Sequence, residues 1–279
     1  MQMQVSTFFD IAGRVSRSSF GADRVTVAGV CLSAESIVDL KCHMPVSLHK
    51  WRDANDDDVK FVVDLLIGNA LAVSAFAIDK SVSAWTNFWR ESQDVNQITS
   101  SLSGKSMSFV KAAAIIKFWL FGQSSALTTS IAINHQRNQL GLNSDDILRV
   151  AERLVFDKEV DGVDNIEMFM DMWQVRNSHQ PLTRLMSVEW EVLSTQLLTE
   201  QSEPLLLLPD YVAGIAHAVH SSVDTITASE VSQVAVLDAH ERLLASSTYV
   251  EKVGVFDLNY FDIFPEFRQF EIPTHASDP

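Results

Sequence analysis

Four aspartates stand where the sequence predicts that strands end or a helix begins. Asp10, Asp79 and Asp157 each close an apolar, strand-like run, and Asp210 lies in the first turn of a predicted helix. In open α/β sheets, reacting groups gather outside the carboxyl ends of the strands. Carboxylates that meet there supply the oxygen ligands that Mg²⁺ and Mn²⁺ prefer. The pattern predicts a metal site with these four acids as ligands.

Carboxylate clusters of this kind suit the hydrolysis of phosphodiesters. Two ions held about 3.5–4 Å apart activate a water and stabilise the leaving oxygen. Each acid also has a structural explanation, because aspartate ends strands and starts turns, and it complements the dipole of a helix N-terminus. Convergence of the acids in space is what distinguishes the two explanations.

The first part of the chain alternates between strand and helix patterns. Residues 4–11 and 23–34 are predicted strands joined as a hairpin. A helix is predicted to begin near Asn55, capped by the acids at 56–58, with Val59, Val62, Val63 and Leu66 on its apolar face. Residues 70–78 are apolar throughout, which is typical of a strand covered on both faces.

The later elements continue this alternation. Residues 81–147 are predicted to be helical, and the segments that follow are a strand at 147–157, a helix at 165–176, a strand at 186–193, a helix at Pro209 and a helix around 230–247, before an irregular tail. This order predicts an α/β fold with a mixed sheet and helices on both faces. We assign residues 1–224 to one domain with a helical insertion at about 81–147, and residues 225–279 to a C-terminal helical extension.

Segment 190–217 resembles the C-terminal motif of a family known as domain of unknown function 3800. The matching residues are Trp190, Ser202, Leu205, Asp210, Ala213 and Gly214, the last two in a small-residue helix expected to pack closely on the sheet. Asp10 and Gly13 resemble the family's first-strand motif, Leu48 and His49 a segment before its first helix, and Asp157 its middle strand. The resemblance implies a ribonuclease-H-like fold and a Mg²⁺- or Mn²⁺-dependent nuclease with catalytic residues Asp10, Asp157 and Asp210.

Three positions depart from the family pattern. Ile11 and Ser47 stand where acids are expected, and Leu207 replaces a glutamine. Loss of groups around a metal weakens a site. Two functions therefore remain: a phosphodiesterase in which Asp10 bridges two ions that Asp157 and Asp210 complete, or a catalytically degenerate protein that acts as an interaction subunit in a larger assembly.

Composition limits the classes of partner. The 279 residues are 47% hydrophobic, and 21 basic against 36 acidic residues give a net charge of −15. Non-specific electrostatic binding of nucleic acid is not expected from this charge, and an acidic surface suits a basic protein. Nucleic acid, a protein partner and a homo-oligomer all stay open. The chain shows no secretory signal and no membrane-spanning run, and Cys31 and Cys42 are expected to be buried reduced thiols, so we expect a cytoplasmic protein without a membrane partner.

Other polar residues have weaker patterns. His217 and His220 lie one turn apart on the predicted helix, but no carboxylate or third histidine at zinc spacing accompanies them. This favours a polar stripe or a packed pair over a metal site. Arg14, Arg17 and His49 are candidate phosphate contacts, and each is equally explained as an ordinary loop residue.

Overall fold

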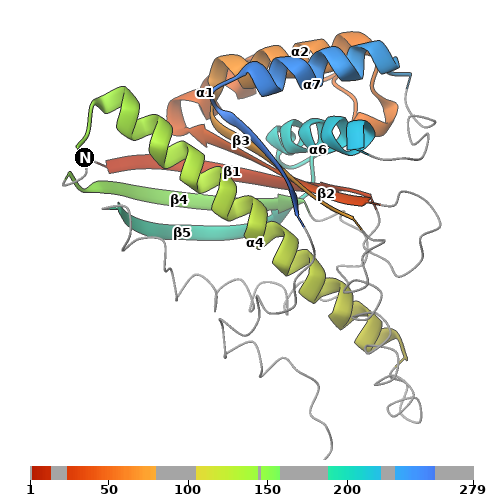
Figure 1. The fold of residues 1–279 in the computed structure, drawn as a ribbon, viewed down its shortest axis with the longest axis horizontal. Helices are drawn as coiled ribbons and strands as arrows, with labels where there is room; N and C mark the ends of the chain where they lie inside the picture. Colours follow the sequence, from red (N-terminus) through yellow and green to blue (C-terminus); the bar gives the residue numbers. More distant parts are fainter. Residues whose placement is uncertain are drawn as a thin grey trace, which may run out of the picture.

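Six strands form one mixed sheet in the described part of this computed structural model (Figure 1). They are β1 (Gln2–Ala12), β2 (Arg24–Ser33), β3 (Ala70–Asp79), β4 (Leu148–Asp157), β5 (Val188–Leu198) and β6 (Tyr249–Gly254). Their order is β5-β4-β1-β2-β3-β6. The β1–β2 and β2–β3 pairs are antiparallel, whereas β4, β5 and β6 run parallel to the strands that they pair with.

The structure describes residues 2–13, 24–79, 105–143, 146–157, 188–220 and 230–254. The helix predicted at 165–176 lies outside these residues, as do the candidate phosphate contacts Arg14 and Arg17.

Helices cover both faces of the sheet (Figure 1). Helix α6 (Leu207–His220) packs against β1, β2 and β3, with α2 (Asp56–Asn69) and α7 (Gln233–Ala245) side by side beyond it and α1 (Ala34–His43) nearby. Helix α4 (Lys105–Leu140), within the predicted insertion, packs against the same three strands from the opposite face, where the second core cluster lies. The predicted class, a mixed α/β sheet of the ribonuclease-H-like kind, is confirmed.

Helix α2 follows the sequence prediction closely. Asn55 caps it and forms a capping box with Asp58, and all four predicted apolar-face residues are buried. Asp56 accepts hydrogen bonds from the backbone N–H and hydroxyl of Ser232, the N-cap of α7. These two acids therefore have structural roles at the start of α2.

Other elements differ from the sequence prediction. Helix α1 was not predicted, because Leu40 is its single buried residue and its apolar pattern is weak. Strand β5 continues to Leu198, five residues beyond the predicted end. Residues 249–254 form the edge strand β6 rather than an irregular tail, so this part of the C-terminal extension shares the sheet of the preceding domain. Cys31 is buried as expected, but Cys42 is exposed.

Two further elements are short. The 3₁₀ turns η1 (Trp51–Asp53) and η3 (Pro204–Leu206) precede α2 and α6 respectively.

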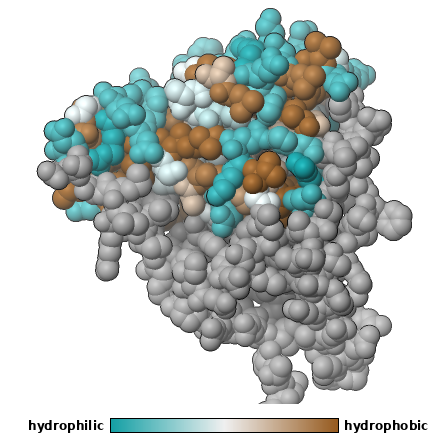
Figure 2. All heavy atoms as spheres, in the orientation of Figure 1, coloured by the Kyte–Doolittle hydropathy of each residue, from teal (hydrophilic) through white to brown (hydrophobic). Residues whose placement is uncertain are grey.

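Across the described ranges, no helix has the length and apolar character needed to span a membrane. Figure 2 shows apolar patches interspersed with polar ones on the visible face, and exposed apolar side chains include Val38, Val46 and Val234.

Candidate metal centre

Asp10 and Asp157 are brought together by the register of two parallel strands. Phe9 of β1 lies opposite Phe156 of β4, and their rings stack with centroids 4.9 Å apart. Phe121 of α4 contacts both rings edge-on, so this pair points toward α4. Successive side chains alternate between the faces of a sheet. Asp10 and Asp157 therefore point to the α6 face, where both are buried.

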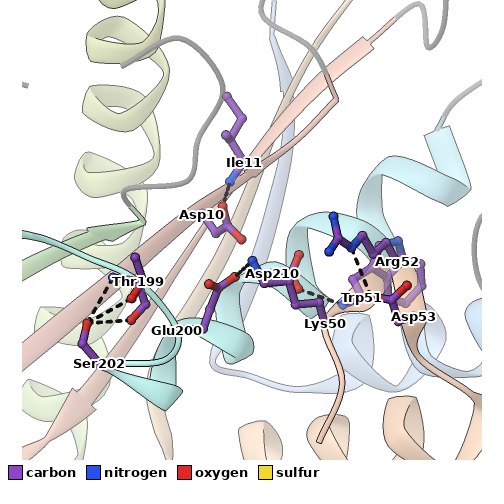
Figure 3. A network of polar contacts seen from close by, with 10 residues as sticks. All are labelled: Asp10, Ile11, Lys50, Trp51, Arg52, Asp53, Thr199, Glu200, Ser202 and Asp210. Carbon is purple, nitrogen blue, oxygen red and sulfur yellow. Dashed lines mark hydrogen bonds and ion pairs between the residues drawn. The ribbon is translucent and has the colours of Figure 1, made fainter. Parts of the chain in front are cut away.

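Glu200 is the third acid of the cluster. Leu198 ends β5 opposite Asp157, and Glu200 follows two residues later in a turn that Thr199 and Ser202 close with hydrogen bonds (Figure 3). Carboxylate oxygens of Asp10, Asp157 and Glu200 lie within 4.8 Å of one another. These three buried carboxylates can hold a metal ion. Glu200 is not among the predicted site residues, because the sequence pattern placed the end of β5 too early.

Asp210, in the first turn of α6, lies beside the cluster and raises the pKa of Asp10. Its Oδ2 accepts a hydrogen bond from the backbone N–H of Trp51 at 2.8 Å, while the hydroxyl of Tyr211 donates to the carbonyl of His49 at 2.9 Å. A Cβ on Gly214 would lie 2.3 Å from the Trp51 ring. Helix α6 thus holds segment 49–51 beside the acids, and Gly214 allows close packing against Trp51 rather than against the sheet.

Lys50 brings a positive charge to the acids. Its Nζ lies 2.6 Å from Oε1 of Glu200 (Figure 3). The other oxygen of that carboxylate, Oε2, is buried and has no hydrogen-bond partner among the described residues. A buried carboxylate oxygen without a partner is costly. Glu200 therefore has one oxygen that a cation could satisfy.

The acids raise one another's pKa values. Burial raises the pKa of Asp10 well above its usual range, and the charges of Asp210 and Asp157 raise it further, against a hydrogen bond from the backbone N–H of Ile11 at 2.6 Å. Burial also raises the pKa of Asp210 to about 7, although the Trp51 N–H and Lys50 both act to lower it. The surrounding protein therefore disfavours the ionised forms of Asp10 and Asp210, and a bound cation would favour them.

Asp79 lies outside this cluster. Strand β2 separates β3 from β1, and the register aligns Asp10 with Ala28 and Ala28 with Ala75. Asp79 is four residues beyond Ala75, or about 13 Å along the strand. His49 is also directed elsewhere, because its Nδ1 lies 3.2 Å from Oδ2 of Asp58. The structure thus brings together Asp10, Asp157 and Asp210 from the sequence prediction and leaves Asp79 apart.

The departures from the family pattern do not remove side chains from the cluster. Ile11 follows Asp10 in β1 and points away from the other acids (Figure 3). Ser47 is exposed, and Leu207 is buried in the core as the first residue of α6. Glu200 and Lys50, which no sequence motif indicated, are the additional charged groups at this edge of the sheet.

Comparisons with other proteins add no assignment. No protein-family model matches the sequence, and no curated protein matches it either. The resemblance to domain of unknown function 3800 stays a prediction, and the candidate centre rests on the geometry of this chain.

Proposed function

We propose that the protein is a metal-dependent phosphodiesterase of the nuclease class that binds Mg²⁺ or Mn²⁺ through Asp10, Asp157, Glu200 and Asp210. The observation that carries the proposal is the convergence of the first three at the carboxyl edge of the sheet. One oxygen of Glu200 is buried there and has no hydrogen-bond partner in the part of the chain that the structure describes. Asp210 lies close enough to raise the pKa of Asp10. Capping of a helix or strand end explains the position of a single acid. It does not explain why acids from separate elements lie close together.

The donor atoms favour hard cations. The three convergent groups offer carboxylate oxygens alone, which is the ligand type that Mg²⁺ and Mn²⁺ prefer. Their oxygens need to approach by at most about 2 Å to reach octahedral spacing around an ion with bonds of about 2.1 Å. Side-chain rotation supplies movements of that size.

Asp10 is the residue that we assign to both ions. The charges of Asp157, Glu200 and Asp210 all raise its pKa, so it lies within reach of each of them. In this arrangement Asp157 and Glu200 would complete one ion site, and Asp210 would complete the other. The backbone N–H of Trp51 donates a hydrogen bond to Oδ2 of Asp210. The other oxygen, Oδ1, is therefore the one that we expect to bind the ion.

Metal ions at such a site lower the pKa of a bound water and polarise the phosphoryl oxygen. Lys50 forms an ion pair with Glu200. The Lys50 ammonium, which lies beside the acids, would be placed to contact a non-bridging oxygen of the substrate phosphate. The bond between Trp51 and Asp210 keeps segment 49–51, and hence Lys50, beside the reacting group.

Hydrolysis of single- and double-stranded DNA and RNA oligonucleotides with Mg²⁺ or Mn²⁺ tests the proposal. Cleavage should stop on addition of EDTA and fall by about 100-fold or more in Asp10→Asn and Glu200→Gln, because each removes a metal ligand. Asp79 also ends a strand but lies outside the cluster, so the Asp79→Asn variant should keep the activity. Cleavage that survives EDTA or Asp10→Asn would refute the proposal, and metal binding without cleavage would favour the degenerate interaction subunit.

A further inference from the structure

A second group of metal-binding side chains lies at the other end of α6. It consists of His220 at the end of α6, His240 of α7 and Glu251 of β6, whose ligand atoms lie within 4.8 Å of one another. Ten residues separate His220 from Asp210, which corresponds to about 15 Å along the helix. The group is therefore distinct from the acid cluster.

The two histidines contact the same carboxylate. Nε2 of His220 contacts Oε1 of Glu251, and Nε2 of His240 lies 2.6 Å from Oε2. The imidazole rings are nearly perpendicular, with an interplanar angle of 86° and centroids 5.7 Å apart. Two ring nitrogens and a carboxylate from three separate elements thus surround one point.

Glu251 is held in place by a further contact. The hydroxyl of Tyr249, two residues earlier in β6, donates a hydrogen bond to its Oε2 at 2.8 Å. Residues that orient a ligand in this way are a regular part of metal sites. The side chains of His240 and Glu251 are 11% and 8% exposed, and that of His220 is 25% exposed. The cluster is mostly shielded from water but opens on the His220 side.

We propose that His220, His240 and Glu251 bind a transition-metal dication of the zinc class. Two imidazole nitrogens and one carboxylate are a known ligand set for Zn²⁺, with bonds of about 2.0–2.2 Å. Ligand atoms in tetrahedral geometry at that bond length lie about 3.3–3.5 Å apart, so modest side-chain rotation is enough. The partial exposure of His220 would allow water to take the fourth position.

The two sites differ in the metals they should select. Oxygen ligands suit Mg²⁺ and Mn²⁺, whereas imidazole ligands suit Zn²⁺, Co²⁺ and Ni²⁺. A metal at the second site would also tie β6, at the edge of the sheet, to α6 and α7. We therefore expect Zn²⁺ binding to stabilise the fold, independently of any hydrolytic activity.

Binding of Co²⁺ and Zn²⁺ to the Asp10→Asn protein tests this inference without interference from the acid cluster. We expect about one equivalent of Co²⁺ with the intense visible absorption of tetrahedral cobalt, and a rise in Tm with Zn²⁺, because the ligands converge only in the native state. In this background His220→Gln should weaken Zn²⁺ binding at least about tenfold, whereas His43→Gln, which changes an exposed histidine of α1, should not.

The result stays interpretable if one variant is unstable. The side chain introduced by His220→Gln can still hydrogen-bond to Glu251. Glu251→Gln provides a second variant, and its Tm in EDTA reports any loss of structure. Unchanged Zn²⁺ affinity in folded His220→Gln and Glu251→Gln proteins, or no Zn²⁺ binding in the Asp10→Asn protein, would overturn the proposal and leave a hydrogen-bonded His–Glu–His cluster. Neither result depends on Mn²⁺ binding or on nuclease activity. The zinc-site proposal can therefore be refuted while the proposed nuclease function stands.

Discussion

Asp10 and Asp157 occupy adjacent places on two parallel strands, one residue beyond the stacked rings of Phe9 and Phe156. The aromatic pair faces α4, and the alternation of the strands turns both carboxylates to the α6 face. A single register thus buries two apolar rings on one side and aligns two acids on the other. A shift of one residue in either strand would separate them.

The metal-free protein should lose stability as the pH rises. The pKa of Asp210 is raised to about 7 by burial, whereas that of an unfolded aspartate is about 3.9. Between these values the native state binds more protons than the unfolded state, so the contribution of Asp210 to stability should fall from about pH 4 to pH 7 and change little above. Asp210→Asn should flatten this fall, because its amide oxygen can still accept the Trp51 N–H. Tm measured in EDTA from about pH 5 to 8 checks this, and identical slopes would contradict it.

Lys50 should both stabilise the metal-free cluster and compete with a bound ion. It contacts Glu200 and lowers the pKa of Asp210. Lys50→Gln is therefore expected to raise the pKa of Asp210 and to lower Tm in EDTA at neutral pH, while tightening Mn²⁺ binding because Glu200 is no longer engaged. Calorimetric titration with Mn²⁺ measures the second effect.

A matched control comes from a second lysine paired with a buried glutamate. Lys41 contacts Glu203, which is not part of the acid cluster. Lys41→Gln should leave the Mn²⁺ affinity unchanged. Equal changes in Mn²⁺ affinity in the Lys50 and Lys41 variants would show that Lys50 has no special relation to the site.

The contact between Gly214 and Trp51 should tolerate no added carbon. A Cβ at position 214 would lie 2.3 Å from the indole ring, so Gly214→Ala should destabilise the protein by about 1–3 kcal/mol. A Cβ on Gly68 of α2 would meet no atom within 4 Å, and Gly68→Ala should stabilise by about 0.5–1 kcal/mol. Urea denaturation of the two variants compares them directly, and similar effects of both would contradict the packing described here.

Strand and helix patterns in the sequence predicted the layered fold and three of the four clustered acids. Those acids follow a local rule, because each stands at the end of a buried strand or the start of an apolar helix. Glu200 falls outside this rule, because it lies two residues beyond β5, an edge strand whose polar residues hid its true end. Asp79 obeys the rule and still lies elsewhere, since local position does not specify which strands are neighbours.

The histidine cluster could not be predicted from spacing. His220, His240 and Glu251 are separated by 20 and 11 residues, and the strand that carries Glu251 was not predicted at all. The pairing of β6 with β3 and the packing of α7 against α6 bring them together. The sequence offered His217 as the metal-binding partner of His220. In the structure, Nδ1 of His217 instead lies 3.4 Å from the hydroxyl of Thr26.

Binding of Mn²⁺ to the purified protein, followed by calorimetry and by Tm, tests the central claim most directly. The account predicts that Mn²⁺ binds and raises Tm in the wild type and in Asp79→Asn, and that Asp10→Asn abolishes most of the shift while keeping the fold in EDTA, because only the native cluster offers the ligands. The absence of any Mn²⁺-dependent shift in the wild type, or an equal shift in Asp10→Asn, would contradict it.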